Sequence, residues 1–459
     1  MRLQWFEVEG YKNIRTPLRL AELGDINVLH GDNNVGKSNL LEAIGLFFLL
    51  VRALREDTRG GPGLRERHAR KARRAAAAAS GRSVARSFDY FVTLGFPPDD
   101  IFDLNGVRPI RLSAQIELDP DDVDSQEPAW LGQPLELTLG LERREDELLL
   151  TLVRAARADG VELSSEGGEA ADDDLTRVLE RLGPRRGHAG LVPRFALIRA
   201  DRTVLTELAL PAGESAPLET REPLPREIGL ALHDAETATG PLRERFDIFA
   251  EALGRFRPLV GEGQWRMIYD RRADRAELSF EGSGGRIPLR LMGSGIQQIA
   301  VLLARLLLTS ADVAAVEEPE LNLRWAAQHL LREALAAIAG ARGGPSQMFV
   351  TSHSPAFEFA PSFYLIERTP EGPSISRRPK EQAPLLLSPD VETPPAGARA
   401  PLSYVTTEGL VRLPDHVREE LGLLEGGGVA FVREKNHGHY RLLTDAQFLD
   451  LLEPRGSEP

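Results

Sequence analysis

The sequence of 459 residues contains no cysteine. This excludes disulfide bonds, zinc sites built on thiolates and a cysteine nucleophile, and it suits a reducing cytoplasm. Long apolar runs are missing as well, because the longest candidate, IGLFFLLV at 44–51, is far shorter than the ~20 residues that a membrane-spanning helix needs. The N-terminal MRLQWFEVEG resembles a strand more than a signal peptide. We therefore expect a cytoplasmic protein without a membrane partner.

Positive charge is scarce overall but concentrated in one stretch. The net charge is −13, yet residues 52–86 carry ten arginines and one lysine against three acids, which gives this stretch +8 and the rest of the chain −21. Such asymmetry predicts one basic feature on an acidic body. It is either a solvated helix with arginine stems on its surface or a surface that contacts DNA phosphates. The predicted DNA contacts are Arg70, Lys71, Arg73 and Arg74.

Alternating strand-like and helix-like patterns predict an α/β fold. Strands are expected at 2–9 and 26–31, and a helix is expected over 38–54. Period-two alternation between about 108 and 154 predicts antiparallel strands, whereas the polar, glycine-rich residues 155–190 predict a loop or a mobile insert. Further helices are expected at 224–258, 293–308 and 323–340, and further strands at 194–202, 276–282, 286–291, 311–319, 347–355 and 363–369.

The stretch GDNNVGKSN, residues 31–39, lies between a predicted strand and a predicted helix. It matches the Gly-x-x-x-x-Gly-Lys-Ser pattern of a loop that binds triphosphates. In such a loop backbone N–H groups and the helix N-terminus face the phosphates, the lysine reaches the β- and γ-phosphates, and the serine ligates Mg²⁺. An ordinary glycine turn is the alternative. The predicted ATP-binding residues are Gly31, Asn33, Asn34, Gly36, Lys37, Ser38 and Asn39, of which Lys37 is also a catalytic candidate and Ser38 also a metal ligand.

Carboxylates follow a later apolar strand, in the order Glu317-Glu318-Pro319-Glu320. A phosphate loop needs carboxylates on a neighbouring strand to hold Mg²⁺ and to activate water. We assign Glu317 to the metal and Glu318 to orienting or deprotonating the attacking water. The alternative is a solvated, acidic helix start, because glutamate is common at helix N-termini.

Two further motifs supply candidate phosphate contacts. LMGSGIQQ at 291–298 opens a helix with small residues. Its N–H groups and the Ser294 hydroxyl, next to Gly295, form a second anion site or a simple helix cap. TSHSP at 351–355 follows an apolar strand. There His353 either donates a hydrogen bond to a γ-phosphate or has a structural role.

The order and spacing of these four motifs resemble the ABC-type ATPase head of the RecF, SMC and OLD group. The resemblance covers residues 1–370 and includes GYKNIRTP at 10–17, where Asn13 and Arg15 would approach the nucleotide. It implies a P-loop NTPase with a mixed sheet and an antiparallel lobe, which binds ATP and Mg²⁺ and hydrolyses ATP. It also implies a homodimer or higher oligomer, in which Lys37 and the partner subunit's Ser294 hold the same triphosphate. His353 would then be the switch residue, and Leu321–Leu323 would cross the interface.

The chain also departs from this group. Glu317 stands where many relatives have aspartate, and Asn322, Arg324 and Trp325 replace a common His-x-His-Pro pattern. Long coiled-coil arms are missing, so a full SMC-type rod is not expected. The metal ligands of the Toprim nuclease domain found in OLD proteins are not evident after His353, so we expect no intrinsic nuclease and a separately encoded effector.

A different composition marks the end of the chain. Nine prolines fall between 361 and 401, which predicts an extended linker over 371–401. Residues 403–443 resemble the AbrB/MazE/SpoVT swapped-hairpin family, which dimerises and often binds DNA. Here five basic residues face six acidic ones, so dimerisation or partner docking is as plausible as DNA binding. The expected domains are the head at 1–370, with a basic helical insertion at about 52–90 and an antiparallel lobe at about 108–205, the linker at 371–401 and a small β-rich domain at 402–459.

Two functions compete on these grounds. The first is a dimeric ATPase that acts on or senses nucleic acid in genome maintenance or anti-phage defence. The alternative is a nucleotide-gated regulator, transcriptional or antitoxin-like, that acts through the AbrB-like tail.

Overall fold

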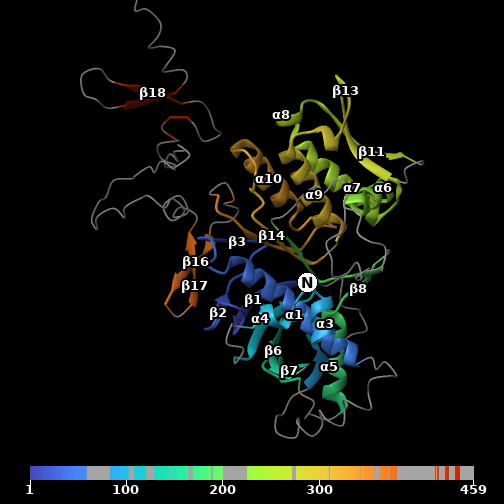
Figure 1. Ribbon diagram of the computed structural model, residues 1–459, viewed down its shortest axis with the longest axis vertical. Coiled ribbons are helices and arrows are strands. Elements are labelled where there is room, and N and C mark those ends of the chain that lie inside the picture. Colours follow the sequence, from blue (N-terminus) through green and yellow to red (C-terminus); the bar gives the residue numbers. More distant parts are fainter. Residues whose placement is uncertain are drawn as a thin grey trace, which may run out of the picture. The chain divides into compact units, whose positions relative to one another are not determined.

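The computed structural model describes residues 1–58, 83–102, 108–119, 129–145, 147–163, 169–187, 190–199, 225–270, 275–309, 311–341, 343–354, 357, 362–370, 372–379, 419, 421–422, 429–433 and 440–444. The chain forms two compact units, Met1–Ala383 and Pro384–Pro459 (Figure 1). Among the described residues no helix is both long and apolar enough to cross a membrane.

A six-stranded sheet forms the centre of the first unit. Its strand order is β10-β14-β15-β3-β16-β17, in which the first five strands are parallel and the last pairs antiparallel. Because β14 and β15 are covered on both faces, every residue in them is buried. The carboxyl ends of the parallel strands therefore lie at one edge. The strands are β10 (Phe195–Ile198), β14 (Val313–Glu317), β15 (Gln347–Thr351), β3 (Ile26–Gly31), β16 (Ser362–Thr369) and β17 (Gly372–Pro379).

Alternate side chains of the central strands enter two separate cores. Val313 and Ala315 belong to one core, whereas Ala314 and Val316 belong to the other. The first core also receives the apolar face of α1 (Lys37–Thr58), and the second receives α9 (Ser294–Leu308) and α10 (Trp325–Ile338). Period-two alternation thus places the phosphate-loop helix on one face of the sheet and the helix of the serine–glycine motif on the other (Figure 1).

An antiparallel sheet completes the first core, in the order β2-β1-β5-β6-β7-β4. Phe6 packs edge-to-face on Phe47 of α1, with ring centroids 6.1 Å apart. The antiparallel strands predicted between about 108 and 154 are confirmed by the pairing of β5, β6 and β7. The loop predicted at 155–190 is wrong in part, because α5 (Glu169–Leu182) lies there and contacts α1. The strands are β2 (Leu18–Leu20), β1 (Arg2–Glu9), β5 (Ile110–Glu117), β6 (Leu135–Arg144), β7 (Glu147–Arg157) and β4 (Ser83–Ser87).

The second core lies under a three-stranded sheet, β11-β12-β13, and its helices. The sequence predicts β12 and β13 but not β11, although Trp265 and Met267 of β11 are buried in alternation. The elements are α6 (Pro225–Thr237), α7 (Pro241–Gly254), α8 (Arg257–Val260), β11 (Gly263–Asp270), β12 (Arg275–Gly282), β13 (Gly285–Pro288) and the 3₁₀ turn η4 (Leu289–Leu291).

The remaining elements are short. Residues 372–379, predicted to belong to the linker, form β17 instead, and Ile375 packs against the first core. In the second unit β18 (Val429–Arg433) pairs antiparallel with β19 (Tyr440–Thr444), where a hairpin is predicted. The others are α3 (Phe88–Thr93), α4 (Pro98–Ile101), η2 (Ala129–Gly132), β8 (Arg185–Gly187) and β9 (Gly190–Val192).

Candidate functional site

The phosphate loop connects β3 to α1 and depends on its glycines. Gly31 has φ +150° and Gly36 has φ +116°. A Cβ at position 31 would lie 2.3 Å from the Ile366 carbonyl oxygen, and one at position 36 would lie 3.1 Å from the Asn13 amide nitrogen. Asn34 between them has φ +61°. These turns give the loop a conformation in which successive N–H groups can face an anion.

Asn13 braces this loop from the segment after β1. Its Nδ2 donates to the Val35 carbonyl oxygen at 3.3 Å, and its Oδ1 accepts from Asn39 Nδ2 at 2.7 Å. Asn13 and Asn39 therefore hold the loop and the first turn of α1 together. Asn33 and Asn34 lie exposed on the loop, and Ser38 lies exposed on the first turn of α1.

Lys37 points back across the loop instead of into solvent. Its Nζ lies 2.7 Å from the Gly31 carbonyl oxygen and 2.9 Å from that of Asp32, and the residue is 6% exposed. Burial lowers the pKa of Lys37 below its ordinary value, although the carboxylates of Glu318, Glu320 and Asp32 act in the opposite direction. The lysine is thus a desolvated cation surrounded by carbonyl and carboxylate oxygens.

The three predicted catalytic side chains meet at one point. His353 Nε2 lies 3.0 Å from Lys37 Nζ and 3.2 Å from Glu318 Oε1. The strand order explains this, because β15, which leads to His353, lies between β14 and β3. The backbone N–H of Glu318 donates to the Thr351 carbonyl oxygen at 3.0 Å, which fixes the acid beside the histidine strand.

The backbone at Glu318 is unusual, with φ +40°. A non-glycine residue in this region costs free energy and often occurs at functional sites. Glu317 immediately before it ends β14 and is 7% exposed. The two neighbouring acids therefore differ in environment, since Glu317 is buried at the strand end and Glu318 turns toward His353.

The serine–glycine motif is not part of this cluster. Ser294 is exposed at the start of α9, and within the described chain no hydrogen bond joins it to the phosphate loop. The neighbouring Gly295 instead lies against the turn after β14, because a Cβ there would be 3.2 Å from Leu323 Cδ2. Arg70, Lys71, Arg73 and Arg74 lie outside the described residues.

Among the described residues no group of three or more His, Asp or Glu side chains could hold a metal ion. This fits Mg²⁺, which is usually held by one or two protein groups together with substrate phosphates and water. Ser38, exposed on the first turn of α1, and Glu317, at the end of β14, are the residues predicted for this role.

Sequence reasoning missed a second cluster that braces α1. Glu42 of α1 accepts from Tyr11 OH at 3.2 Å, from Arg199 Nη1 at 2.9 Å and from Lys12 Nζ. Burial acts to raise the pKa of Glu42, but hydrogen bonds and charge from Lys12 and Arg199 lower it below its ordinary value. This carboxylate ties the segment after β1 and the end of β10 to the helix that begins with Lys37.

His30 is another residue that no sequence signal indicated. It is fully buried on β3, its Nδ1 lies 2.8 Å from the Ser352 carbonyl oxygen, and its ring packs edge-to-face on Phe363. Its Nε2 has no hydrogen-bond partner among the described residues. Burial lowers the pKa of His30 to about 4, so the ring is neutral in the folded protein at neutral pH.

This burial predicts an acid-sensitive fold. The unfolded chain protonates His30 near pH 6.5, whereas the folded chain does so near pH 4. The stabilisation from the neutral ring is therefore complete above pH 6.5 and is lost as pH falls toward 4, by up to about 3 kcal/mol. Denaturant unfolding between pH 7 and 4 tests this. His30→Asn keeps a hydrogen-bond donor without a titrating ring and should flatten that slope, and an unchanged slope would contradict the assignment.

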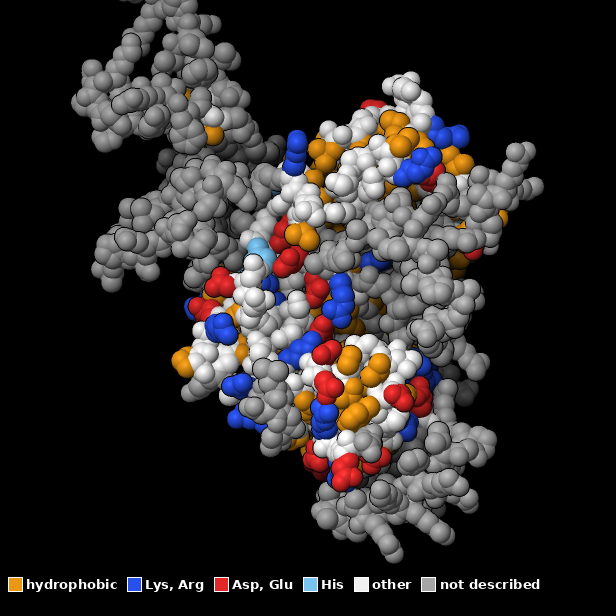
Figure 2. Space-filling view, viewed as in Figure 1, with side chains coloured by type: hydrophobic (Ala, Val, Ile, Leu, Met, Phe, Trp, Pro, Cys, Tyr) orange, Lys and Arg blue, Asp and Glu red, His pale blue; other side chains and the backbone are white. Residues whose placement is uncertain are grey.

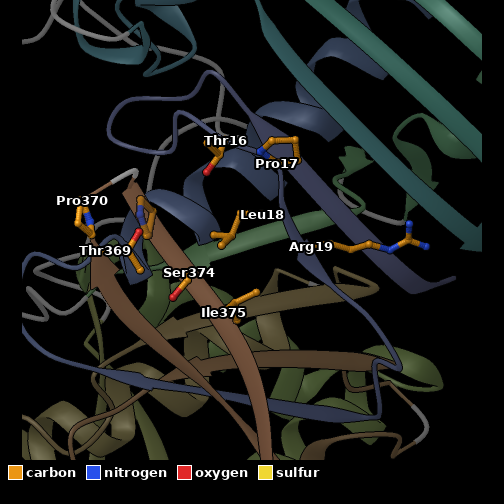
Figure 3. A pocket seen from close by; sticks show the side chains of 9 residues that line it. Thr16, Pro17, Leu18, Arg19, Thr369, Pro370, Ser374 and Ile375 are labelled. Carbon is orange, nitrogen blue, oxygen red and sulfur yellow. The ribbon is translucent and has the colours of Figure 1, made fainter.

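A cavity of about 600 Å³ lies between β2 and the β16–β17 hairpin (Figure 3). Thr16, Pro17 and Arg19 line it from one side and Pro370 and Ile375 from the other. The three predicted catalytic residues do not line this cavity. It is therefore distinct from the Lys37–His353–Glu318 cluster.

Comparison with known proteins gives a family and a set of distant structures. A crystal structure described as "SmcHead bound to the C-winged helix domain of ScpA" has TM-score 0.48 and 12% identity, covering 83% of this chain and 100% of that chain. The "SMC head domain from Thermotoga maritima" has TM-score 0.42 and 14% identity, covering 82% and 99%. An SMC head with an extended coiled coil bound to the C-terminal domain of ScpA, from Pyrococcus furiosus, has TM-score 0.43 and 11% identity, covering 84% and 98%.

No curated protein matches the chain. Residues 26–357, well over half of the sequence, match the profile of a family described as "AAA domain, putative AbiEii toxin, Type IV TA system". The matched region runs from β3 to the end of the histidine motif and so includes the phosphate loop and the acidic strand. The chain belongs to this family of AAA domains.

Proposed function

We propose that the protein binds ATP with Mg²⁺ and hydrolyses it. The observation that carries this is the convergence of Lys37, His353 and Glu318 beside the phosphate loop, with His353 Nε2 at 3.0 and 3.2 Å from the other two side chains. A cation, an imidazole and a carboxylate at one helix N-terminus suit a reaction that transfers a phosphoryl group to water. The family supports the same reaction class.

Each residue has a separate role in this proposal. Lys37 and the loop N–H groups bind the phosphates, and His353 donates a hydrogen bond to the γ-phosphate. Glu318 accepts a proton from the attacking water. Ser38 and Glu317 hold Mg²⁺, which neutralises charge on the phosphate oxygens when bound. Ser294 and Gly295 have no role in this reaction within one subunit, because they lie apart from the cluster of Lys37, His353 and Glu318.

We further propose that these two residues complete the site of a second copy. Ser294 is exposed at a helix N-terminus, where N–H groups favour an anion. Two large apolar side chains are exposed as well. Leu291, three residues before Ser294, is 68% exposed, and Leu321, in the turn whose Leu323 lies against Gly295, is 40% exposed. An exposed anion site with apolar neighbours suits a surface that is covered by another protein. Dimerisation would then depend on ATP.

Action on nucleic acid is the third part of the proposal. On the face shown in Figure 2, acidic and basic side chains of the described residues are intermixed. The net +8 stretch at 52–86 is the strongest basic feature of the sequence, so Arg70, Lys71, Arg73 and Arg74 are the proposed DNA contacts. The family description, which names a toxin of a toxin–antitoxin system, supports a defence role with a separately encoded partner.

The alternative is a regulator that binds DNA through the second unit. Two matched variants separate it from the first proposal, each neutralising four basic residues. One replaces Arg70, Lys71, Arg73 and Arg74 by alanine, and the other replaces Arg412, Arg418, Arg433 and Lys435 by alanine.

Two measurements on these variants test both functions. They are the ATPase rate with and without DNA and the DNA affinity as a function of salt concentration. We expect the first variant to lose the stimulation of its ATPase rate by DNA. The slope of its log DNA affinity against log salt concentration should fall in magnitude by up to about 4, because each lost phosphate contact removes ~0.9 from that slope. Loss of DNA affinity in the second variant alone would favour the regulator. Wild-type protein that hydrolyses no ATP with any nucleic acid would overturn the ATPase.

A further inference from the structure

Glu320 is an acidic residue of the site that the reaction above does not use. It lies in the turn after β14, and its Oε1 accepts two hydrogen bonds from the chain after β15. The donors are the backbone N–H of His353 at 2.6 Å and the Ser352 hydroxyl at 2.8 Å. One carboxylate oxygen therefore fixes the backbone that carries His353.

Keeping this carboxylate buried is costly. Its Oε2 is enclosed and has no hydrogen-bond partner within the described chain. Burial raises the pKa of Glu320 above its ordinary value, because the charged form loses its hydration. A buried acceptor without a partner costs about 1–3 kcal/mol, which offsets part of the stabilisation from the two hydrogen bonds to Oε1.

The backbone around Glu320 leads to the start of α9. The Glu320 carbonyl oxygen accepts from the Leu323 N–H at 2.9 Å, which closes a tight turn with Asn322 at φ +62°. The Leu323 side chain lies against Gly295, where a Cβ would approach to 3.2 Å. The same turn thus touches the His353 segment at one end and the N-terminus of α9 at the other.

A second connection runs in parallel. Gln328 Nε2 donates to the Leu323 carbonyl oxygen at 2.9 Å, and its Oε1 accepts from the Ser354 hydroxyl at 2.7 Å. The turn and the His353 segment are therefore joined on both sides of the histidine. Movement of Leu323 would displace Glu320 and Gln328 together, and both act on residues 352–354.

We propose that Glu320 is a positioning residue that holds His353 in line with Lys37 and Glu318 and couples that position to the N-terminus of α9. This rests on the proposed ATP hydrolysis and, for the link to α9, on the proposed composite site, and it names the regulation of that site. Engagement of Ser294 and Gly295 by a nucleotide moves Leu323 and, through Glu320, sets His353 of the same subunit. Occupancy of one composite site thereby changes turnover at the other.

Three variants test the positioning. Glu320→Ala removes both accepted hydrogen bonds, Glu320→Gln keeps an oxygen acceptor without charge, and Glu333→Gln removes an exposed charge from α10 as the control. Glu320→Ala should lower kcat by about 10–100-fold, since small misplacement of a reacting group has effects of this size. Nucleotide Kd should change by less than about 3-fold because Lys37 and the N–H groups of the phosphate loop still bind the phosphates. Glu320→Gln should recover most of kcat, and the control should match wild type.

A readout without nucleotide separates this inference from the proposed function. Hydrogen–deuterium exchange of the peptide 349–354 reports on the His353 N–H, which donates a hydrogen bond to Glu320. Glu320→Ala should speed this exchange at least about 10-fold in the free protein. If the wild-type protein has no ATPase activity, the proposed reaction is overturned. The exchange measurement would still decide whether Glu320 holds the backbone of His353.

The coupling to α9 has its own test. Gly295→Ala places a methyl 3.2 Å from Leu323. It should change exchange in 349–354 more in the wild-type background than with Glu320→Ala, where only the Gln328 connection remains, as a double-mutant cycle shows for coupled residues. Equal effects in both backgrounds would overturn the coupling. The positioning role would be overturned if Glu320→Ala changed neither kcat nor exchange. It would also be overturned if Glu320→Ala lowered kcat, nucleotide affinity and thermal stability together and Glu320→Gln did not restore them.

Discussion

Replacing Lys37 by alanine is expected to abolish measurable ATP binding. Lys37 is the only basic side chain of the 31–39 loop, and its Nζ lies within 2.9 Å of two loop carbonyl oxygens. Removing it leaves the triphosphate charge without its closest cation. We expect Kd to rise at least about 100-fold, equivalent to ~3 kcal/mol, as measured by calorimetry with a non-cleavable analogue and Mg²⁺.

Two further variants show whether charge or packing is responsible. Because Lys37 is 6% exposed, alanine also removes a buried stem. Lys37→Met keeps that stem and should lose ATP binding to the same degree while retaining more thermal stability. Lys435→Ala in the second unit is a charge-matched control and should bind ATP normally. Retained affinity in both Lys37 variants would reject the phosphate-loop assignment.

Much of the fold could be predicted because its determinants are local. β14 and β15 are short apolar runs bounded by polar residues, and α9 is a long apolar helix opened by small residues. The phosphate loop requires glycine at positions 31 and 36 for steric reasons, so its sequence pattern is specific. Such features predict an element without knowledge of what packs on it.

Elements that depend on distant partners were missed. α5 lies in an acidic, glycine-flanked stretch, yet Leu175, Val178, Leu179 and Leu182 are buried at helical spacing against the first core. β17 contains two prolines and two arginines, a composition typical of a linker, and it is a strand because it pairs with β16. Tertiary contacts override weak local preference in both cases.

The site shows the same division. Lys37, Glu318 and His353 could each be selected from a motif, but their meeting depends on the strand order β14-β15-β3, which joins residues 316 positions apart. Glu320 and Asn13 act through hydrogen bonds to segments remote in sequence. The resemblance places Asn13 near the nucleotide, but a single sequence contains no direct signal for these hydrogen-bond pairings.

Glu318→Gln should slow ATP hydrolysis by about 10²–10⁴-fold, the range expected for loss of a general base, while ATP binding is retained. The amide keeps the size of the side chain and can still meet His353 Nε2, which lies 3.2 Å from Oε1, but it cannot accept a proton from water. The backbone at φ +40° is unchanged, so the folded state should keep its stability. Single-turnover phosphate release and thermal unfolding measure these two outcomes.

Glu317→Gln is the matched comparison, because the two residues are adjacent and differ in role. Loss of a metal ligand should weaken Mg²⁺-dependent ATP binding, whereas Glu318→Gln should leave it intact. If ATP joins two subunits, Glu318→Gln should also accumulate a dimer in the presence of ATP, measured by light scattering, because the bound nucleotide persists. Normal turnover in Glu318→Gln would remove this residue from the role of base. Slow turnover without a change in mass would confine ATP to one subunit and leave Ser294 without a nucleotide to contact.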